Sequence, residues 1–304
     1  MLPPWAIGTQ GPDQSGIPPV ERTRKPRAKV SAKEQAKAAR VVARSLGKAY
    51  REAFTGADDP ARGVQWRAPR SVLNGRISAH RRFASQHYPI DRVKAVAAAA
   101  EGSINDVFLA ICAGALRRYL QEIDQLPEAS LVANVPVSVR TTEGASVGNS
   151  ITFLFAQIGT DIEDPIERIK AIRESTQSGK DQVPDVSGAA MDAYTAGLMG
   201  PFLTQALVGA GGKGRPSSNL VISNVPGLQE QRFLCGSKID EFYPLSLLWH
   251  GQGLNITAVS NAGWFDVGFT GCKDSVPHLQ RIAVYAGEAL DELEGALGLT
   301  WKEA

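Results

Sequence analysis

Cysteine, histidine and long apolar runs are all scarce in this chain of 304 residues. The three cysteines, Cys112, Cys235 and Cys272, are an odd number without C-x-x-C spacing, which favours a reducing, cytoplasmic setting over a disulfide framework. No uninterrupted apolar stretch approaches the ~20 residues that a membrane-spanning helix needs. The sequence therefore indicates a protein that is soluble or lies against a membrane surface.

The patterns of several common site types are also missing. No G-x-S-x-G nucleophile elbow occurs, and the glycine-rich segment at 209–215 lacks the Lys-Ser/Thr ending of a phosphate-binding loop. The four histidines show no i, i+4 pairing. We therefore expect neither a metal site nor a serine-hydrolase site.

Positive charge is concentrated in one segment. The net charge of +2 hides eleven Lys or Arg residues against two Glu between Glu21 and Arg51. Residues 1–30, rich in Pro and Gly, are typical of an extended linker, and residues 31–70 of a basic helix and its connector. Ser31 and Glu34 have the capping-box spacing that starts such a helix. The helix could be a solvated connector or a contact with a lipid surface; without interleaved aromatic residues we expect no nucleic-acid partner.

The segment from Ser103 to Arg140 predicts a capped helix followed by a buried strand. Ser103 and Asp106 are spaced as a capping pair, and nearly every residue from Val107 to Leu120 is apolar. A surface helix would carry polar residues on its outer side, so we expect this one to lie in a core. The residues expected to be buried include Leu109, Ile111 and Leu116.

Residues 71–299 predict one compact α+β domain. Helices are expected at 91–100, 105–120, 164–180 and 278–297, and strands at 80–89, 130–140, 149–158, 219–223, 238–248, 254–260 and 264–270. Strands interleaved with helices, followed by several strands in succession, indicate a mixed-sheet sandwich. Pro226-Gly227 predicts a type II turn after the strand that ends at Ser223.

Four short segments, in this order, resemble the C-terminal half of the bacterial wax ester synthase/diacylglycerol acyltransferase family. They are Asn105-Asp106-Val107, Val135-Pro136-Val137-Ser138-Val139-Arg140, Ser223-Asn224-Val225-Pro226-Gly227 and Gly251-Gln252-Gly253-Leu254-Asn255-Ile256-Thr257. Their order and spacing resemble the family from about Leu2 to Leu299. The resemblance implies a chloramphenicol-acetyltransferase-like, condensation-domain-like fold.

The resemblance also implies a function. Members of the family transfer an acyl group from acyl-CoA to a fatty alcohol or diacylglycerol, using a His-His-x-x-x-Asp-Gly motif that the 304 residues do not contain. The chain therefore resembles the C-terminal half, and a partner chain that supplies the N-terminal domain is expected. The resemblance implies acyl-CoA as substrate, no separate cofactor, and contact with membranes or lipid droplets. The alternative is a non-catalytic remnant that binds acyl chains or lipid surfaces.

The candidate orienting residues of the substrate channel also come from the resemblance. They are Asn105, Asp106, Arg140, Ser223, Asn224, Pro226 and Gly227. Asn105 and Asp106 could serve only to cap their helix, or could also line the channel. Arg140 could pair with a carboxylate inside the domain, which we favour, or bind a phosphate group.

His87 and Asp91 spell H-x-x-x-D, a shortened form of the missing motif. Gln86 and Arg92 stand where the motif has its second His and its Gly, so we interpret His87 as a strand residue and Asp91 as a helix cap. A stand-alone enzyme that uses His87 and Asp91 is the least favoured reading. We expect the chain alone to lack acyltransferase activity, and its residues 1–30 to be open to protease.

Overall fold

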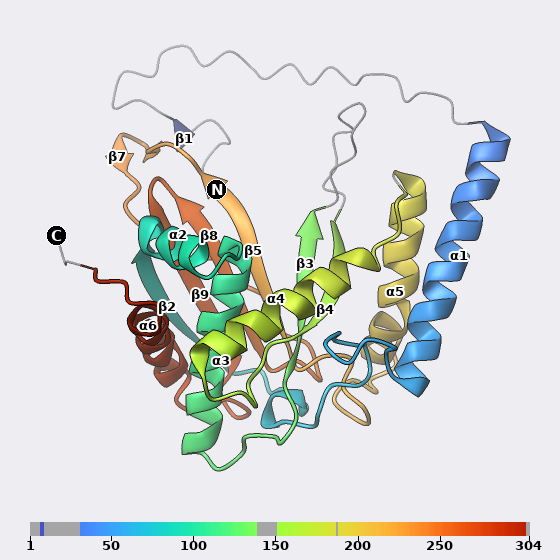
Figure 1. Cartoon of the computed structure of the whole chain (residues 1–304), viewed down its shortest axis with the longest axis horizontal. Helices are drawn as coiled ribbons and strands as arrows, with labels where there is room; N and C mark the ends of the chain where they lie inside the picture. Colours follow the sequence, from blue (N-terminus) through green and yellow to red (C-terminus); the bar gives the residue numbers. More distant parts are fainter. Residues whose placement is uncertain (1–6, 9–30, 139–150, 187, 302–304) are drawn as a thin grey trace.

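The computed structural model describes residues 7–8, 31–138, 151–186 and 188–301. The predicted compact domain is built on a mixed six-stranded sheet (Figure 1). In spatial order its strands are β2 (Arg81–Pro89), β9 (Trp264–Cys272), β8 (Leu254–Asn261), β5 (Leu220–Leu228), β3 (Val132–Ser138) and β4 (Ile151–Gln157). β5 runs parallel to both β3 and β8, and the other neighbours are antiparallel.

Four helices cover one face of the sheet and build the main core (Figure 1). They are α2 (Ile90–Ala99), α3 (Ile104–Glu122), α4 (Pro165–Asp181) and α6 (Leu279–Ala296). α3 lies at the centre, where Leu109, Ile111 and Leu116 are at most 1% exposed, so the predicted buried helix is confirmed. The apolar side chains around α3 pack on the sheet on one side and on α4 and α6 on the others.

A second, smaller core lies on the opposite side of β3 and β4. There α1 (Ala32–Thr55) packs on α5 (Ala189–Leu207), and α5 packs on β4. Val42 of α1, Tyr194 of α5 and Phe155 of β4 meet in this cluster. The basic helix is therefore attached to the body of the domain by its apolar stripe.

The remaining described elements are short. They are a 3-10 turn at Val72–Asn74 and a small sheet of β1 (Ile7–Gly8), β6 (Phe233–Leu234) and β7 (Ser237–Lys238). β1 lies within the expected linker and pairs with β6; the rest of residues 1–30 falls outside the described residues, as does Arg140.

β3 and β5 pair at only two positions and then diverge (Figure 1). The pairs are Ala133 with Leu220 and Asn134 with Val221. Asn134 lies where the strands separate; it is 3% exposed, and its Oδ1 has no hydrogen-bond partner among the described residues. The sheet is thus split towards the carboxyl ends of these two strands.

Two sequence predictions about the strands are wrong. β5 continues through Pro226 and Gly227 as a strand with a bulge, and Gly227 does not have the positive φ of a type II turn. The expected strand at 238–248 is paired only at Ser237–Lys238. Ile239 N still donates to the Arg232 carbonyl oxygen, but beyond it the segment crosses the sheet, and Phe242 N and Ser246 N donate to side chains, so no ladder forms.

Candidate functional site

The amino terminus of α3 holds the first pair of candidate residues. The predicted capping box is present: Ser103 Oγ accepts a hydrogen bond from Asp106 N, while Asp106 Oδ2 accepts from Ser103 N at 2.9 Å and Ser103 Oγ at 2.6 Å. Asp106 Oδ1 accepts a further hydrogen bond from Thr176 Oγ1 of α4 at 2.8 Å. Both oxygens of this buried carboxylate are therefore occupied by contacts that fix the end of α3 and join it to α4.

Asn105 differs from its neighbour. Its side chain is half-buried and makes no hydrogen bond within the described ranges. Asp106 lines an open depression of about 860 Å³ between the start of α3 and α4, whereas Asn105 is not among its lining residues. Of the two, Asn105 is the residue whose polar group is free to contact a ligand.

β5 carries the second group of candidates, which the pleat divides between two faces. Ile222 packs in the main core, so Asn224 points to the helix-covered side and Ser223 to the other side. Gly227 allows a close approach to β8, because a Cβ there would lie 2.0 Å from the Ser260 carbonyl oxygen. Because their side chains point to opposite faces of the sheet, Ser223 and Asn224 cannot both contact a ligand that lies on one face.

The face opposite the four helices, called the open face below, carries a row of polar side chains. The strand register aligns Ser223 with Thr257 of β8, Gly268 of β9 and Ser85 of β2. Buried polar groups cost free energy unless they are hydrogen-bonded. Most of these side chains are satisfied by a segment of chain that lies over them.

That segment, Asp240–Leu248, is called the strap. Phe242 N donates to Asp266 Oδ2 at 2.8 Å, and Ser246 Oγ lies 3.1 Å from Thr257 Oγ1. Gly268 lies directly beneath the strap: a Cβ there would lie 2.0 Å from the Pro244 carbonyl oxygen. The strap is thus held to the sheet through its backbone and its serine.

The strap turns apolar side chains away from the sheet. Phe242, Leu245 and Leu247 are 52%, 72% and 81% exposed. Their spacing in a segment of irregular backbone is the one sequence signal that could have identified this surface. The strand predicted at 238–248 would have placed alternate side chains on the sheet, so this apolar surface was not predicted.

His87 lies beside the strap and has a carboxylate partner. Its Nδ1 is 2.5 Å from Oδ1 of Asp266, a fully buried residue of β9, and its ring stacks on Trp264 at 4.0 Å. Asp91 instead pairs with Lys94, so it is not the partner of His87. It lies in the first turn of α2, whose N-cap is Pro89, so the predicted cap role of Asp91 is wrong. Asp266 also accepts from Asn261 and from the strap, which gives His87 a role in anchoring the strap.

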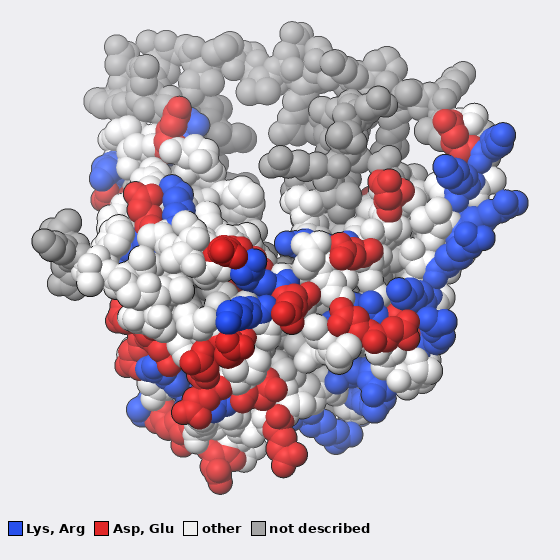
Figure 2. Space-filling model, in the orientation of Figure 1, with Lys and Arg blue, Asp and Glu red and all other residues white. Residues whose placement is uncertain are grey.

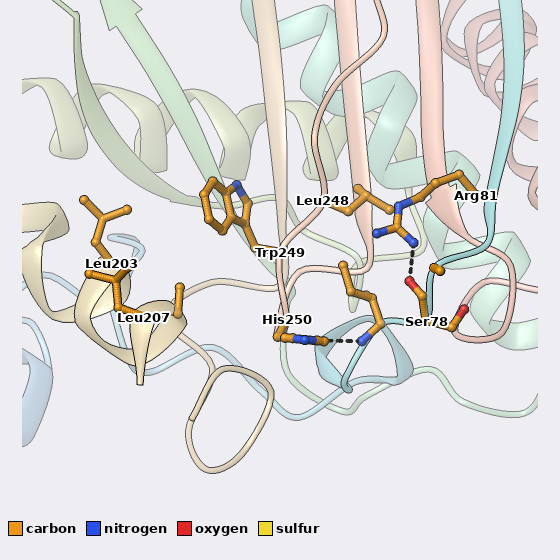
Figure 3. Close-up of a pocket in the computed structure, with 10 residues that line it drawn as sticks. Ser78, Arg81, Leu203, Leu207, Leu248, Trp249 and His250 are labelled. Atoms are coloured by element: carbon orange, nitrogen blue, oxygen red, sulfur yellow. Dashed lines mark hydrogen bonds between the residues drawn. The ribbon is translucent and has the colours of Figure 1, made fainter. Parts of the chain in front are cut away.

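An apolar recess of about 560 Å³ lies between α5 and the start of β2 (Figure 3). Leu203 and Leu207 of α5 form one side, and Leu248 and Trp249 form the other. Leu207 is 88% exposed, so the recess is open to its surroundings. His250 at its edge accepts a hydrogen bond from Ile77 N through Nδ1 at 3.0 Å, so its ring is held by the fold.

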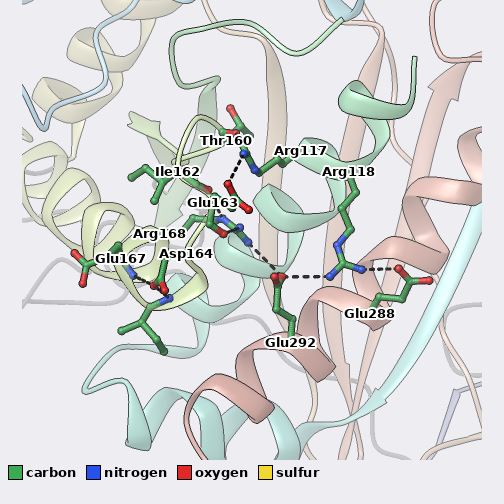
Figure 4. Close-up of polar contacts among 11 residues, drawn as sticks. Arg117, Arg118, Thr160, Ile162, Glu163, Asp164, Glu167, Arg168, Glu288 and Glu292 are labelled. Atoms are coloured by element: carbon green, nitrogen blue, oxygen red, sulfur yellow. Dashed lines mark hydrogen bonds and ion pairs between the residues drawn. The ribbon is translucent and has the colours of Figure 1, made fainter. Parts of the chain in front are cut away.

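Charged side chains also gather among α3, α4 and α6, where they contact one another and the backbone (Figure 4). Arg168 is 3% exposed, donates to the carbonyl oxygens of Ile162 and Glu163, and lies 3.7 Å from Glu292. Burial lowers the pKa of Arg168, and Glu292 partly offsets that effect. Each donor in this cluster is directed at a neighbour in the fold, so it joins helices rather than forming an open site.

No single helix within the described residues is long and apolar enough to cross a membrane. The pair α2 and α3 passes such a test jointly, but it is bent by 99°, and α3 is the core helix of the domain.

Two family models match the chain. One, described as the wax ester synthase/diacylglycerol acyltransferase catalytic domain, matches residues 7–108, and the other, the WS/DGAT C-terminal domain, matches residues 147–294. A putative diacylglycerol O-acyltransferase of Mycobacterium tuberculosis is 46% identical over 238 residues, which cover 76% of this chain and 48% of that protein. The chain thus spans about half the length of this relative.

Solved structures agree with the fold. The wax ester synthase/diacylglycerol acyltransferase from Marinobacter aquaeolei VT8 superposes with a TM-score of 0.69 at 30% identity, covering 97% of this chain and 64% of that one. The cyclization-docking bidomain of a peptide synthetase from Sorangium cellulosum reaches 0.52 at 16% identity, covering 93% of this chain and 54% of that one, a likeness of fold alone. The predicted α+β, condensation-domain-like class is confirmed.

Proposed function

This chain belongs to the wax ester synthase/diacylglycerol acyltransferase family, and we propose that it forms part of an O-acyltransferase that uses acyl-CoA. The acceptor is the hydroxyl of a fatty alcohol or a diacylglycerol, and the product is a wax ester or a triacylglycerol. Acyl-CoA is a substrate in this proposal, and no separate cofactor takes part.

The apolar surface formed by the recess and the strap is the observation that carries this proposal. Leu203, Leu207 and Trp249 line the recess, and Leu245 and Leu247 extend the apolar surface along the strap. Each methylene group that leaves water contributes ~0.8 kcal/mol, so a long acyl chain gains substantially by lying here. We assign this surface to one wall of the acyl-binding channel.

The proposed chemistry is a single acyl transfer. The acceptor hydroxyl oxygen attacks the thioester carbonyl carbon, its proton passes to a general base, and the carbon–sulfur bond breaks to release CoA thiol. The family resemblance assigns the base to the His-His-x-x-x-Asp-Gly motif, which these 304 residues do not contain. In this proposal the base is supplied by an N-terminal domain that carries this motif, either in the same protein or as a partner chain.

The hydrogen bonds of the candidate orienting residues decide which of them can still contact a substrate. Asn105, Ser223 and Asn224 have side chains without hydrogen bonds in the described part of the chain, so they are the proposed polar contacts to substrate: Ser223 on the open face, and Asn105 and Asn224 on the helix-covered side. Asp106 is assigned to holding the end of α3, since its oxygens are occupied. Because the acceptors are lipids, we also place the protein at the surface of a membrane or lipid droplet.

Thiol release from palmitoyl-CoA in the presence of hexadecanol tests the proposal. The chain alone should give no turnover, and adding the N-terminal part of the Marinobacter aquaeolei relative should produce it. Leu207→Asp should reduce that turnover at least about tenfold by placing a charge on the acyl wall. Val284→Asp, on an exposed apolar residue of α6, is the matched control and should leave turnover unchanged.

Two results would contradict the proposal. One is a stable complex of the two parts without turnover, which would favour a non-catalytic lipid-binding protein. The other is turnover by this chain alone that disappears in His87→Ala, which would assign the base to the His87–Asp266 pair.

A further inference from the structure

α1 carries two opposite stripes along its length. One is the apolar stripe that packs on α5, centred on Val42, Leu46 and Ala53. The other is a row of exposed cations: Lys33, Lys37, Arg40, Arg44, Lys48 and Arg51. At ~100° per residue these cations fall within an arc of about 80° on the side opposite the buried stripe. The row is about 27 Å long at ~1.5 Å per residue, and it follows the outer edge of the molecule (Figure 2).

The charge of this row is largely uncompensated. Lys33, Lys37, Arg40 and Arg44 form no ion pair with any described residue. The two acids of α1 offset little of this charge, because Glu34 closes the capping box and Glu52 is buried against Arg62 at 2.6 Å, with only Lys48 of the row beside it at 3.9 Å. Like charges three and four residues apart destabilise a helix. The row therefore weakens α1 within the isolated fold and calls for an external anion.

The carboxyl-terminal end of α1 adds an apolar group to the row. Phe54 is 82% exposed and flanks the cations on the helix surface. Arg67 donates a hydrogen bond to the Phe54 carbonyl oxygen at 3.1 Å and so extends the positive charge past the helix end. Interfacial helices combine Lys and Arg with apolar side chains that enter the headgroup region, and on α1 Phe54 is the exposed apolar side chain available for that contact.

We propose that the cationic row of α1 is a docking surface for an anionic lipid layer. The helix lies flat, lipid phosphates contact its cations, and the Phe54 ring enters the headgroup region. The inference rests on the proposed function, because it names the lipid surface at which that enzyme meets its acceptors. A row on a convex edge without intervening aromatic residues suits a flat lipid surface better than a nucleic-acid strand.

Vesicle co-sedimentation of the whole chain tests the proposal. The chain should bind vesicles that contain phosphatidylglycerol, should not bind phosphatidylcholine alone, and should dissociate as salt is raised. The triple variant Lys37→Gln, Arg40→Gln, Arg44→Gln should bind at least about tenfold more weakly. The control triple Lys94→Gln, Lys170→Gln, Lys238→Gln loses the same charge from residues that are paired with carboxylates, and should bind like the parent.

The same variants distinguish lipid docking through α1 from the alternative explanations of vesicle binding. Equal binding to neutral vesicles, or equal weakening in both triples, would overturn the assignment to α1. Tighter, salt-sensitive binding to duplex DNA than to anionic vesicles would also overturn it and indicate a nucleic-acid surface. Thermal unfolding confirms that both triples stay folded. In the two-part assay, acyl transfer with detergent-dispersed substrates should be unchanged in the α1 triple, and its loss in the triple alone would assign the row to the catalytic assembly and overturn the docking assignment. Absence of turnover in the parent would count against the proposed function instead.

Discussion

Removing the carboxylate of Asp106 separates the two roles considered for the Asn105-Asp106 pair. In Asp106→Ala three hydrogen bonds disappear: two from Ser103 and one from Thr176. Thr176 is 1% exposed and Asp106 5%, so water cannot fully replace the lost acceptor. The change therefore affects the start of the core helix and its attachment to α4 together.

The expected change in the free energy of unfolding can be estimated from these hydrogen bonds. Hydrogen bonds to a charged acceptor contribute ~1.5–3 kcal/mol each, although Ser103 can recover part of its share from water. Loss of the negative charge at the helix amino terminus adds ~0.5 kcal/mol. We expect Asp106→Ala to lower the free energy of unfolding by about 3 kcal/mol, which corresponds to a fall in Tm of about 6 °C for a chain of this size.

Asn105→Ala is the counterpart. Without a hydrogen bond to lose, it should change stability by less than about 0.5 kcal/mol. In the two-part acyltransferase assay it should nevertheless lower kcat/KM, because Asn105 is a proposed contact to substrate. Denaturant unfolding of Asp106→Ala, Thr176→Val and the double variant should show coupling between these two positions. Destabilisation by Asn105→Ala together with a neutral Asp106→Ala would refute the division of roles.

Three further predictions concern the fold that supports the site. Gly227→Ala should cost about 2 kcal/mol in denaturant unfolding, because its Cβ would meet a backbone oxygen of β8. Arg62→Met should cost ~3–5 kcal/mol by stranding the buried Glu52 carboxylate, and Glu52→Gln in the same chain should recover most of it. Hydrogen bonds from the capping serine hold the pKa of Glu34 below 4.5, so its contribution to α1 is present above that pH. It is lost as pH falls through the depressed value, and hydrogen exchange in the first turn of α1 should then accelerate.

Local signals in the sequence predicted the starts of α1 and α3 correctly, although not the cap of α2. Ser31 with Glu34, and Ser103 with Asp106, are separated by three residues, and both pairs form complete capping boxes. Such contacts lie within one turn, so the spacing alone determines them. The burial of α3 could also be predicted from the sequence, because a helix that is apolar all round has no side suited to contact with water.

Contacts between strands that are distant in the sequence could not be predicted from such local patterns. The pairing of His87 with Asp266 depends on the register of β2 against β9, which no local pattern contains. Pro226-Gly227 has the composition of a turn, but Gly227 serves the close approach of β5 to β8. In both places the tertiary environment overrides the local preference.

The contacts on the open face decide which of its polar groups remain for a substrate. His87, Asp266 and Thr257 are engaged with one another or with the strap, so recruiting any of them would require the strap to leave the sheet. Ser223 lies in the same row, but its hydroxyl makes no hydrogen bond in the described part of the chain. An acceptor hydroxyl that approaches along the apolar wall can therefore meet Ser223 without breaking an existing contact. An apolar wall with few free polar groups is consistent with the proposed acyl channel.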